Sequence, residues 1–288
     1  MKKQGKYQKK KNFERNSRRN FDLSDNYTHI VPIPSKRHFT CNNTVMISGF
    51  PSPGMIGTIV CAHLIEELRM HQIAYVHSKY IMPGVLWVGG KLRHPFRIYS
   101  NQDNSVCVMT CDVPVLQTAI DSISASITNW CGENQVDKFL VVSGSYPENI
   151  QPFPYNLAKR TAFIIEGDDN LKRTVQNNGK DNENQIPQFA FIGGLSGQML
   201  SDCVVRFIQC LAILVPTLNF SPDPEGAALA IETLGRIVPN AKVSSSQLRQ
   251  EAEIIKKQLS ELGKLQYRLA KSGDSKDLMR DDKGQIYK

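Results

Sequence analysis

A glycine-rich stretch near residue 50 has the spacing of a loop that binds phosphate. Gly49 and Gly54 stand five positions apart, as in the P-loop, which then requires Lys and Ser or Thr directly after the second glycine. Met55 and Ile56 occupy those positions, so no cation reaches the β- and γ-phosphates and no hydroxyl holds Mg²⁺. The dinucleotide fingerprint fails as well, because too many residues separate the first two glycines. We therefore expect a rigid turn shaped by Gly49, Pro51, Gly54 and Gly57.

The other candidates for catalysis do not assemble into a known constellation. Gly144-Ser145-Tyr146-Pro147 follows an apolar run but is not the G-x-S-x-G elbow of serine hydrolases. A second glycine loop, Gly194-Leu195-Ser196-Gly197, is one residue short of that elbow, so Gly194 and Gly197 are also expected to be structural. The six histidines form no HxH or HExxH pair. We expect no metal, no cofactor and no enzymatic activity; a phosphorylase-like or hydrolase-like enzyme that uses the glycine loops is an alternative hypothesis.

The C-terminus carries a different kind of chemistry. From Lys271 onward the sequence is polar, until it closes with Ile286, Tyr287 and Lys288. A flexible tether of this kind would present Ile286 to an apolar slot, pack the Tyr287 ring with its hydroxyl bonded, and offer the terminal carboxylate to a cation. Capture of a terminal carboxylate is a recurring mode of peptide recognition.

The loops must be held in place by the elements on either side of them, which are apolar runs expected as strands and amphipathic segments expected as helices. They predict an α/β fold with three layers, α/β/α, and a mostly parallel sheet. A hairpin is expected in which 85–88 pairs with 96–99 across Gly89-Gly90. The remaining strands are expected at 45–49, 72–80, 106–111, 137–143, 162–165, 189–192 and 211–215, with 30–31 as an edge strand. Helices are expected at 58–68, 115–131, 198–210 and 224–237.

Asp223 and Pro224 give a clear helix start, with the carboxylate as N-cap and proline at the first position, where a missing N–H costs nothing. A last helix carries apolar residues at heptad spacing over 248–269. The chain therefore divides into four expected regions. These are a disordered basic tail (1–22), the α/β domain (23–243), a C-terminal helix (244–270) and a flexible tail with the terminal docking residues (271–288).

Charge and cysteine content exclude several functions. Residues 1–20 alone account for the net charge of +8, so the body has no charge excess and we do not expect nucleic acid as a partner. No apolar run reaches membrane-spanning length, and no signal core stands at the N-terminus, so we expect a cytoplasmic protein and no membrane partner. The seven cysteines form no CxxC pair and fall in apolar patterns, which is typical of reduced, buried thiols.

Several of these stretches together resemble the proteasome assembly chaperone 2 family, including its archaeal homologues. The likeness spans about residues 45–269 and includes the glycine opening, the helix that ends at Trp130 and the loop 194–197. It continues at Pro222-Asp223-Pro224 with Ala227-Ala228. The Ser52-Pro53 spacing, the basic N-terminal tail and the polar segment 166–186 depart from the family pattern.

The resemblance implies a phosphorylase/hydrolase-like α/β fold without an established catalytic role, often in homo-oligomers. Proteasome-binding members of that family end in a hydrophobic residue, a tyrosine and any residue, which enter pockets between α subunits of the 20S ring. Ile286, Tyr287 and Lys288 match that motif by position. The resemblance thus implies an ATP-independent assembly chaperone whose partners are 20S α subunits, as a homo-oligomer or with a paralogous chaperone. An activator that opens the gate of the mature 20S particle is the alternative.

Overall fold

The computed structural model describes residues 28–34, 44–88, 90–151, 160–167, 187–217 and 221–254. The chain divides into two units, Met1–Ser245 and Ser246–Lys288; the second is described only over 246–254, which are helical. The predictions for the basic tail 1–22, for most of the polar segment 166–186 and for the C-terminal residues Ile286, Tyr287 and Lys288 lie outside the described residues.

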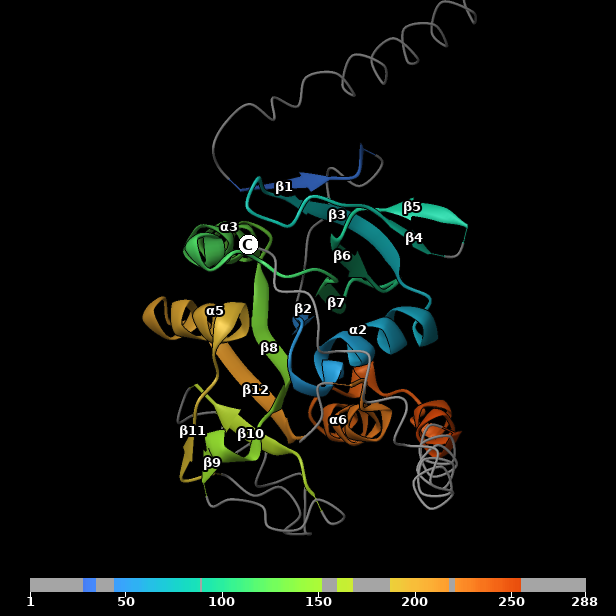
Figure 1. Ribbon diagram of the computed structural model, residues 1–288. Helices are drawn as coiled ribbons and strands as arrows, with labels where there is room; N and C mark the ends of the chain where they lie inside the picture. Colours follow the sequence, from blue (N-terminus) through green and yellow to red (C-terminus); the bar gives the residue numbers. More distant parts are fainter. Residues whose placement is uncertain are drawn as a thin grey trace, which may run out of the picture. The chain divides into compact units, whose positions relative to one another are not determined.

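An eight-stranded mixed sheet forms the centre of the first unit (Figure 1). Its order is β1-β3-β6-β7-β2-β8-β12-β10. The four strands β7, β2, β8 and β12 run parallel, and the pairs on either side of them are antiparallel. In chain order the strands are β1 (His29–Pro32), β2 (Thr44–Gly49), β3 (His71–His77), β6 (Phe96–Ser100), β7 (Val106–Cys111), β8 (Val136–Ser145), β10 (Phe163–Glu166) and β12 (Gln209–Pro216).

The parallel strands lie in the middle because their side chains are apolar on both faces. Every residue of β7 is buried, as are the last seven residues of β8 and of β12. Such continuous runs are typical of strands covered by helices on both sides. β1 is an edge strand, paired only with β3 among the described elements, as its short apolar run predicts.

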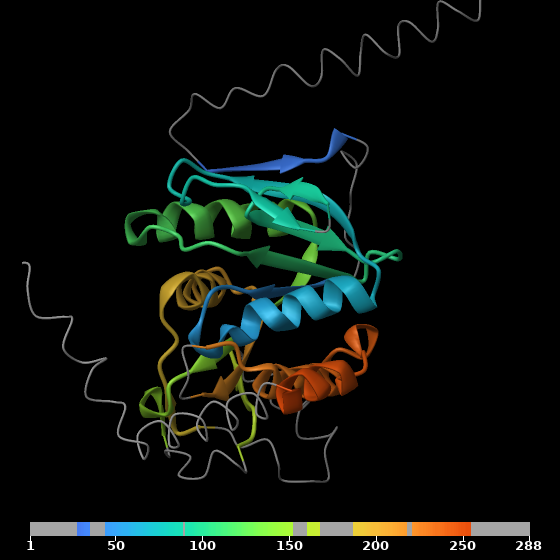
Figure 2. The same ribbon diagram turned by 45° about the vertical axis from the view of Figure 1, so that its right-hand side comes forward.

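In the described part of the chain, four helices cover the sheet and complete three layers. α2 (Ile56–Glu67) packs against α6 (Pro224–Ile237) on one face, while α3 (Ile120–Glu133) packs against α5 (Gly194–Val205) on the other. Figures 1 and 2 show the sheet between these two helix pairs. The predicted three-layer α/β fold is confirmed.

The predicted hairpin has a different second strand. β4 (Leu86–Val88) pairs with β5 (Lys91–Arg93), not with the segment 96–99, which belongs to β6 and joins β3 to β7 in the main sheet. Burial explains the difference, because all five residues of β6 are buried whereas Lys91 and Leu92 of β5 are exposed. The correct partner is the polar strand that stays at the surface.

The region around the second glycine loop also differs from the prediction. The segment 189–192 supplies only the short strand β11 (Phe189–Ala190), which pairs with β9 (Ile150–Gln151) in a separate two-stranded sheet. Helix α5 begins at Gly194 rather than at 198, so the glycines lie in its first turns. α3 likewise begins at Ile120, after the short 3-10 helix η3 (Gln117–Ala119), rather than at 115.

Candidate functional site

The first glycine loop connects β2 to α2. At Gly49 and Gly57 the backbones of β2, α2 and β8 approach so closely that no side chain would fit. A Cβ atom on Gly49 would lie 2.0 Å from the carbonyl oxygen of Gly57, and one on Gly57 would lie 2.4 Å from that of Val142. Real Cβ atoms do not approach this closely, so both positions require glycine. The N-terminus of α2 therefore rests directly on the ends of β2 and β8.

The loop is also held on the end of β8. The N–H of Gly144 donates a hydrogen bond to Ser52 Oγ at 3.2 Å, and a Cβ atom on Gly144 would lie 1.9 Å from the carbonyl oxygen of Pro53. Residues 53–55 form the 3-10 helix η2 (Pro53–Met55), in which Gly54 has a φ of 66°. This conformation favours glycine over any residue with a side chain.

Asp223 ties the loop to helix α6. Its N–H donates to the carbonyl oxygen of Gly54 at 2.9 Å, and its carboxylate accepts from the N–H of Gly226 at 2.9 Å as the helix N-cap. Arg160 donates through both terminal nitrogens to the same carboxylate, with Nη2 at 2.7 Å from Oδ1. Burial raises the pKa of Asp223, but the hydrogen bonds from Arg160 and Gly226 outweigh it and hold the pKa below its usual value.

A cavity of about 400 Å³ lies at the carboxyl ends of β2, β7 and β8. Both glycine loops border it, so the fold brings together stretches that are some 140 positions apart in the sequence. Open α/β sheets place ligands at this edge of their parallel strands. The walls are mainly apolar, contributed by Phe50, Pro51, Pro53, Cys111, Val113, Pro114, Val115, Ile120, Phe191, Ile192, Leu195 and Leu214.

The polar atoms of this cavity do not form a catalytic set. None of the described residues that line it is Asp, Glu, His, Lys or Arg. Ser143 and Ser145 donate their hydroxyls to the carbonyl oxygens of Gly144 and Tyr146, so no base withdraws their protons. Burial raises the pKa of the Cys111 thiol to about 12, which keeps it protonated and a poor nucleophile.

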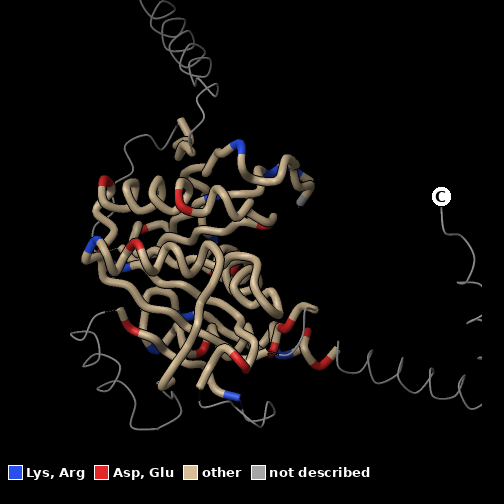
Figure 3. The backbone as a smooth tube through the Cα atoms, turned by 60° about the vertical axis from the view of Figure 1, so that its left-hand side comes forward, with Lys and Arg blue, Asp and Glu red and all other residues tan. Residues whose placement is uncertain are grey.

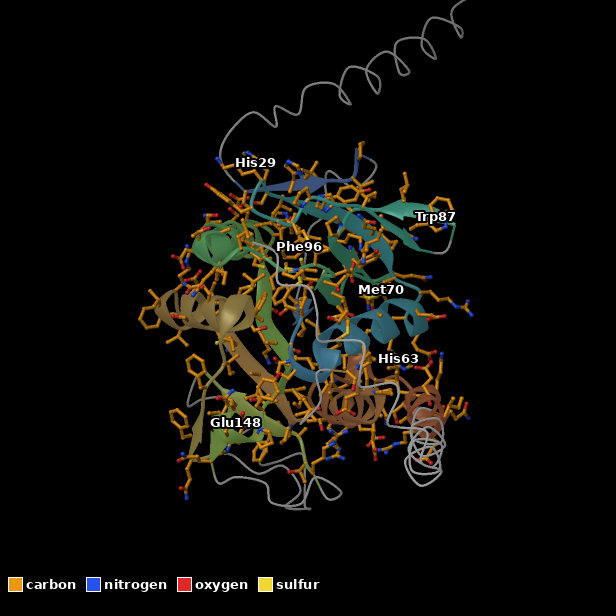
Figure 4. The ribbon with its side chains drawn as sticks, viewed as in Figure 1. His29, His63, Met70, Trp87, Phe96 and Glu148 are labelled. Carbon is orange, nitrogen blue, oxygen red and sulfur yellow. The ribbon has the colours of Figure 1, made fainter. Side chains whose placement is uncertain are left out.

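None of the described histidines lines the cavity, and they are spread over β1, α2, β3 and the segment between β5 and β6. Figure 4 places His29 on β1 and His63 on α2, where His63 Nε2 lies 2.7 Å from the carbonyl oxygen of Ser244. His77 and His94 are neighbours, with ring centroids 6.0 Å apart, and burial lowers the pKa of His94. Within the described segments, no three His, Cys, Asp or Glu side chains gather closely enough to hold a metal ion.

Among the described residues, two partly buried ion pairs were not predicted from the sequence. Arg97 pairs with Asp112 at the end of β7, and Arg160 pairs with Asp223. Burial is the main influence on Asp112 and raises its pKa, although Arg97 opposes this. A signal for the first pair was present in the sequence, because Arg97 interrupts an apolar strand and a buried charge requires a partner.

The described surface gives no sign of a charged stripe or of a membrane-spanning helix. Figure 3 shows the Lys and Arg positions of the described chain interspersed with Asp and Glu rather than collected in one stripe. No helix in the described ranges is both long and apolar enough to span a membrane.

Comparison with known proteins identifies the family. The sequence matches the model of the PAC2 family over residues 46–263, and the chain belongs to this family. An uncharacterized protein of Methanocaldococcus jannaschii is 26% identical over 220 residues, which cover 76% of this chain and 85% of the relative.

Solved structures share the fold. PbaA of Pyrococcus furiosus, described as an archaeal homolog of proteasome-assembly chaperone, is 26% identical with a TM-score of 0.67; the match covers 82% of this chain and 96% of PbaA. PbaB of the same organism, described as an archaeal proteasome activator, has a TM-score of 0.69 at 17% identity, covering 83% of this chain and all of PbaB. The likeness to PbaB concerns the fold alone.

Proposed function

We propose that this chain is an ATP-independent assembly chaperone or adaptor of the 20S proteasome that works by binding rather than by catalysis. Membership of the PAC2 family over residues 46–263 is the observation that carries the proposal. The similarity to PbaA, a homolog of proteasome-assembly chaperone, supports it. The wall of the cavity, which offers no charged or histidine side chain among its described residues, supports the non-catalytic part.

The proposed contact uses the last three residues of the sequence. Ile286 fills an apolar slot between neighbouring α subunits, Tyr287 packs its ring and hydrogen-bonds through its hydroxyl, and the Lys288 carboxylate pairs with a pocket lysine. A homo-oligomer presents several such tails together, which raises the apparent affinity through effective concentration. The cytoplasm is the proposed location.

Docking is tested by measuring the binding of the full chain to immobilised 20S particles and to free α subunits. We expect deletion of 286–288, or Tyr287→Ala, to weaken binding at least about tenfold, since the anchoring aromatic group and the carboxylate are lost. One extra residue after Lys288 displaces the carboxylate and should weaken binding comparably. Tyr7→Ala, which removes a tyrosine from the other end of the chain, is the matched control and should bind normally. Equal binding by the truncated form would remove the tail from the proposal.

The second candidate is an activator of the mature particle, and its specific support is the fold shared with PbaB. The two functions differ in their effect on an assembled 20S particle. An activator increases the rate of peptide hydrolysis by mature particles, whereas an assembly chaperone increases the yield of particles from free subunits and leaves that rate unchanged.

A further inference from the structure

The hairpin β4–β5 presents an apolar pair to water. Trp87 and Leu92 stand opposite each other in its register, and their side chains have exposed fractions of 70% and 67%. Met82 and Val85, just before β4, have exposed fractions of 51% and 60%. A two-stranded hairpin is only marginally stable by itself, so a further strand or surface that covers this apolar face would stabilise it.

Positive charge without a counter-charge lies on the same hairpin. Lys91 and Arg93 alternate with Leu92 along β5, so their side chains are on the face opposite to the apolar pair. Neither cation forms an ion pair with a described residue. The sequence around them is one-sided as well, because the stretch 68–102 contains no Asp or Glu. A partner therefore meets apolar groups on one face of the hairpin and unpaired cations on the other.

The outer edge of β5 is open among the described strands. There β5 pairs with β4 alone, and the two form a sheet separate from the eight-stranded one. Such an edge carries N–H and C=O groups with which an extended segment can pair, as in the addition of a strand to a sheet. In Figures 1 and 4 the hairpin and its Trp87 lie at the periphery of the fold, where an added segment has access.

Charge selects among the possible occupants of this edge. A second copy of the chain, joined to β5 by two-fold symmetry, would bring Lys91 and Arg93 against their own counterparts, and like charges across a strand pair are unfavourable. Nucleic acids and anionic membranes are bound by many cations acting together, whereas β5 offers two. An acidic extended segment complements both the charge and the open edge.

We propose that the outer edge of β5 binds an extended segment of a partner protein in which acidic and apolar residues alternate. Successive side chains of a strand point to opposite faces, so the carboxylates lie beside Lys91 and Arg93 while the apolar side chains cover Trp87 and Leu92. This surface does not include the terminal residues 286–288. The proposal therefore goes beyond the docking of the tail and does not rest on it.

The test titrates the full chain with the capped peptide Glu-Leu-Glu-Phe-Glu-Leu-Glu (the Glu peptide) and follows the indole N–H signals by ¹H–¹⁵N NMR. The sequence has two tryptophans, Trp87 and Trp130, so the spectrum of Trp87→Ser assigns both signals. We expect the Trp87 signal to shift with a Kd of about 0.1 mM and the Trp130 signal to stay in place. The peptide with Gln in place of Glu should bind about fivefold more weakly, because it lacks the charges.

The apolar contribution is tested by removing one exposed side chain. Trp87→Ser should weaken binding of the Glu peptide at least about tenfold, as measured by fluorescence anisotropy of the labelled peptide. The matched control is Val205→Ser, which removes an apolar side chain with an exposed fraction of 72% at the end of α5. This control should bind the peptide normally.

The charge contribution is tested by reversal. Lys91→Glu combined with Arg93→Glu should weaken binding of the Glu peptide at least about tenfold, because attraction becomes repulsion. The same variant should bind the peptide with Lys in place of Glu more tightly than the wild type does, which shows that its surface is intact. Arg236→Glu combined with Lys242→Glu reverses two exposed cations on and after α6, and this control should leave binding unchanged.

Three results would overturn the proposal: an unmoved Trp87 signal, equal binding of the Glu and Gln peptides, or equal binding by Trp87→Ser and the wild type. Tighter binding of phosphatidylserine vesicles or of single-stranded RNA than of the Glu peptide would overturn it in favour of a membrane or a nucleic acid. Sedimentation tests the remaining occupant, since an oligomer that dissociates in Trp87→Ser would assign the surface to a second copy. Trp87→Ser should still bind 20S particles, so a failure of tail docking is distinguishable.

Discussion

Gly49 and Gly57 show how single residues determine the shape of the loop at the end of β2. Each occupies a point where a Cβ atom would collide with a backbone carbonyl group rather than with a movable side chain. Backbone cannot yield without disturbing the adjacent strand, so these glycines are required for packing. The sequence reasoning reached the same interpretation from the missing lysine and hydroxyl after Gly54.

We expect Gly49→Ala to reduce the free energy of unfolding by about 2–4 kcal/mol, because the new methyl group forces α2 away from the sheet. Urea denaturation followed by circular dichroism measures the change. The matched control is Gly132→Ala in α3, where a Cβ atom meets nothing within 4 Å. This control should be neutral or stabilising by up to about 1 kcal/mol, and a comparable loss in both variants would contradict the packing argument.

Asp223 gives a pH-dependent prediction. Its folded pKa lies below the usual value, so its contribution to stability is present above about pH 4 and is lost as the pH falls through the folded pKa. Asp223→Asn retains a side chain that can cap α6 but leaves the partly buried Arg160 without its counter-charge. We expect a loss of about 3 kcal/mol at pH 7.

The loss should shrink as the pH falls below the folded pKa, because protonation makes the wild-type carboxyl neutral as well. Urea unfolding at neutral and strongly acidic pH measures both limits. Asp137→Asn, at an exposed position, is the control and should change stability by less than about 0.5 kcal/mol at either pH. A loss from Asp223→Asn that did not depend on pH would mean that the ion pair is not its cause.

At the scale of elements, the hairpin β4–β5 differs from the strands around it. Trp87 and Leu92 have exposed fractions of 70% and 67%, although both are large apolar residues. The nearby β6 is fully buried and contributes Phe96, whose ring packs edge-to-face on Phe50 at 5.8 Å between centroids. Figure 4 shows Trp87 on the hairpin and Phe96 inside the fold. The hairpin therefore contributes little to the core.

We expect Trp87→Ser and Leu92→Ser to change the free energy of unfolding by less than about 0.5 kcal/mol each, because water already reaches these side chains. Phe96→Ala, in the neighbouring strand, should cost about 3–5 kcal/mol by leaving a cavity against Phe50. Equilibrium unfolding in urea compares the three variants. A large loss from either serine substitution would show that the hairpin packs against the domain.

The errors of the sequence reasoning at this scale have a common origin. Apolar content alone does not reveal that β5 pairs with β4, because the charged residues Lys91 and Arg93 are typical of a turn rather than of a strand. The start of α5 at Gly194 was missed because glycine is a poor helix former, and only the packing of the helix on β8 and β12 overrides that preference.

At the scale of the whole molecule, the three-layer fold was predictable because its central strands are apolar without interruption and alternate with amphipathic helices. The cavity was not predictable, since its wall combines residues from the ends of β2, β7 and β8 with the start of α5. Their proximity depends on strand order, and local periodicity does not determine which strands become neighbours. The role of 286–288 stays a prediction, because these residues lie outside the described part of the chain.

Strand order also has a consequence for folding during synthesis on the ribosome. β12 is the parallel neighbour of β8, yet 63 positions separate the end of one from the start of the other. Until residues 209–216 have been synthesised, β8 lacks this neighbour and forms an open edge of the sheet. Its apolar residues 139–142, which are buried in the complete fold, then lie beside unpaired N–H and C=O groups, and such an edge can pair with strands of other chains. The proposed assembly chaperone therefore passes through an aggregation-prone stage during its own synthesis.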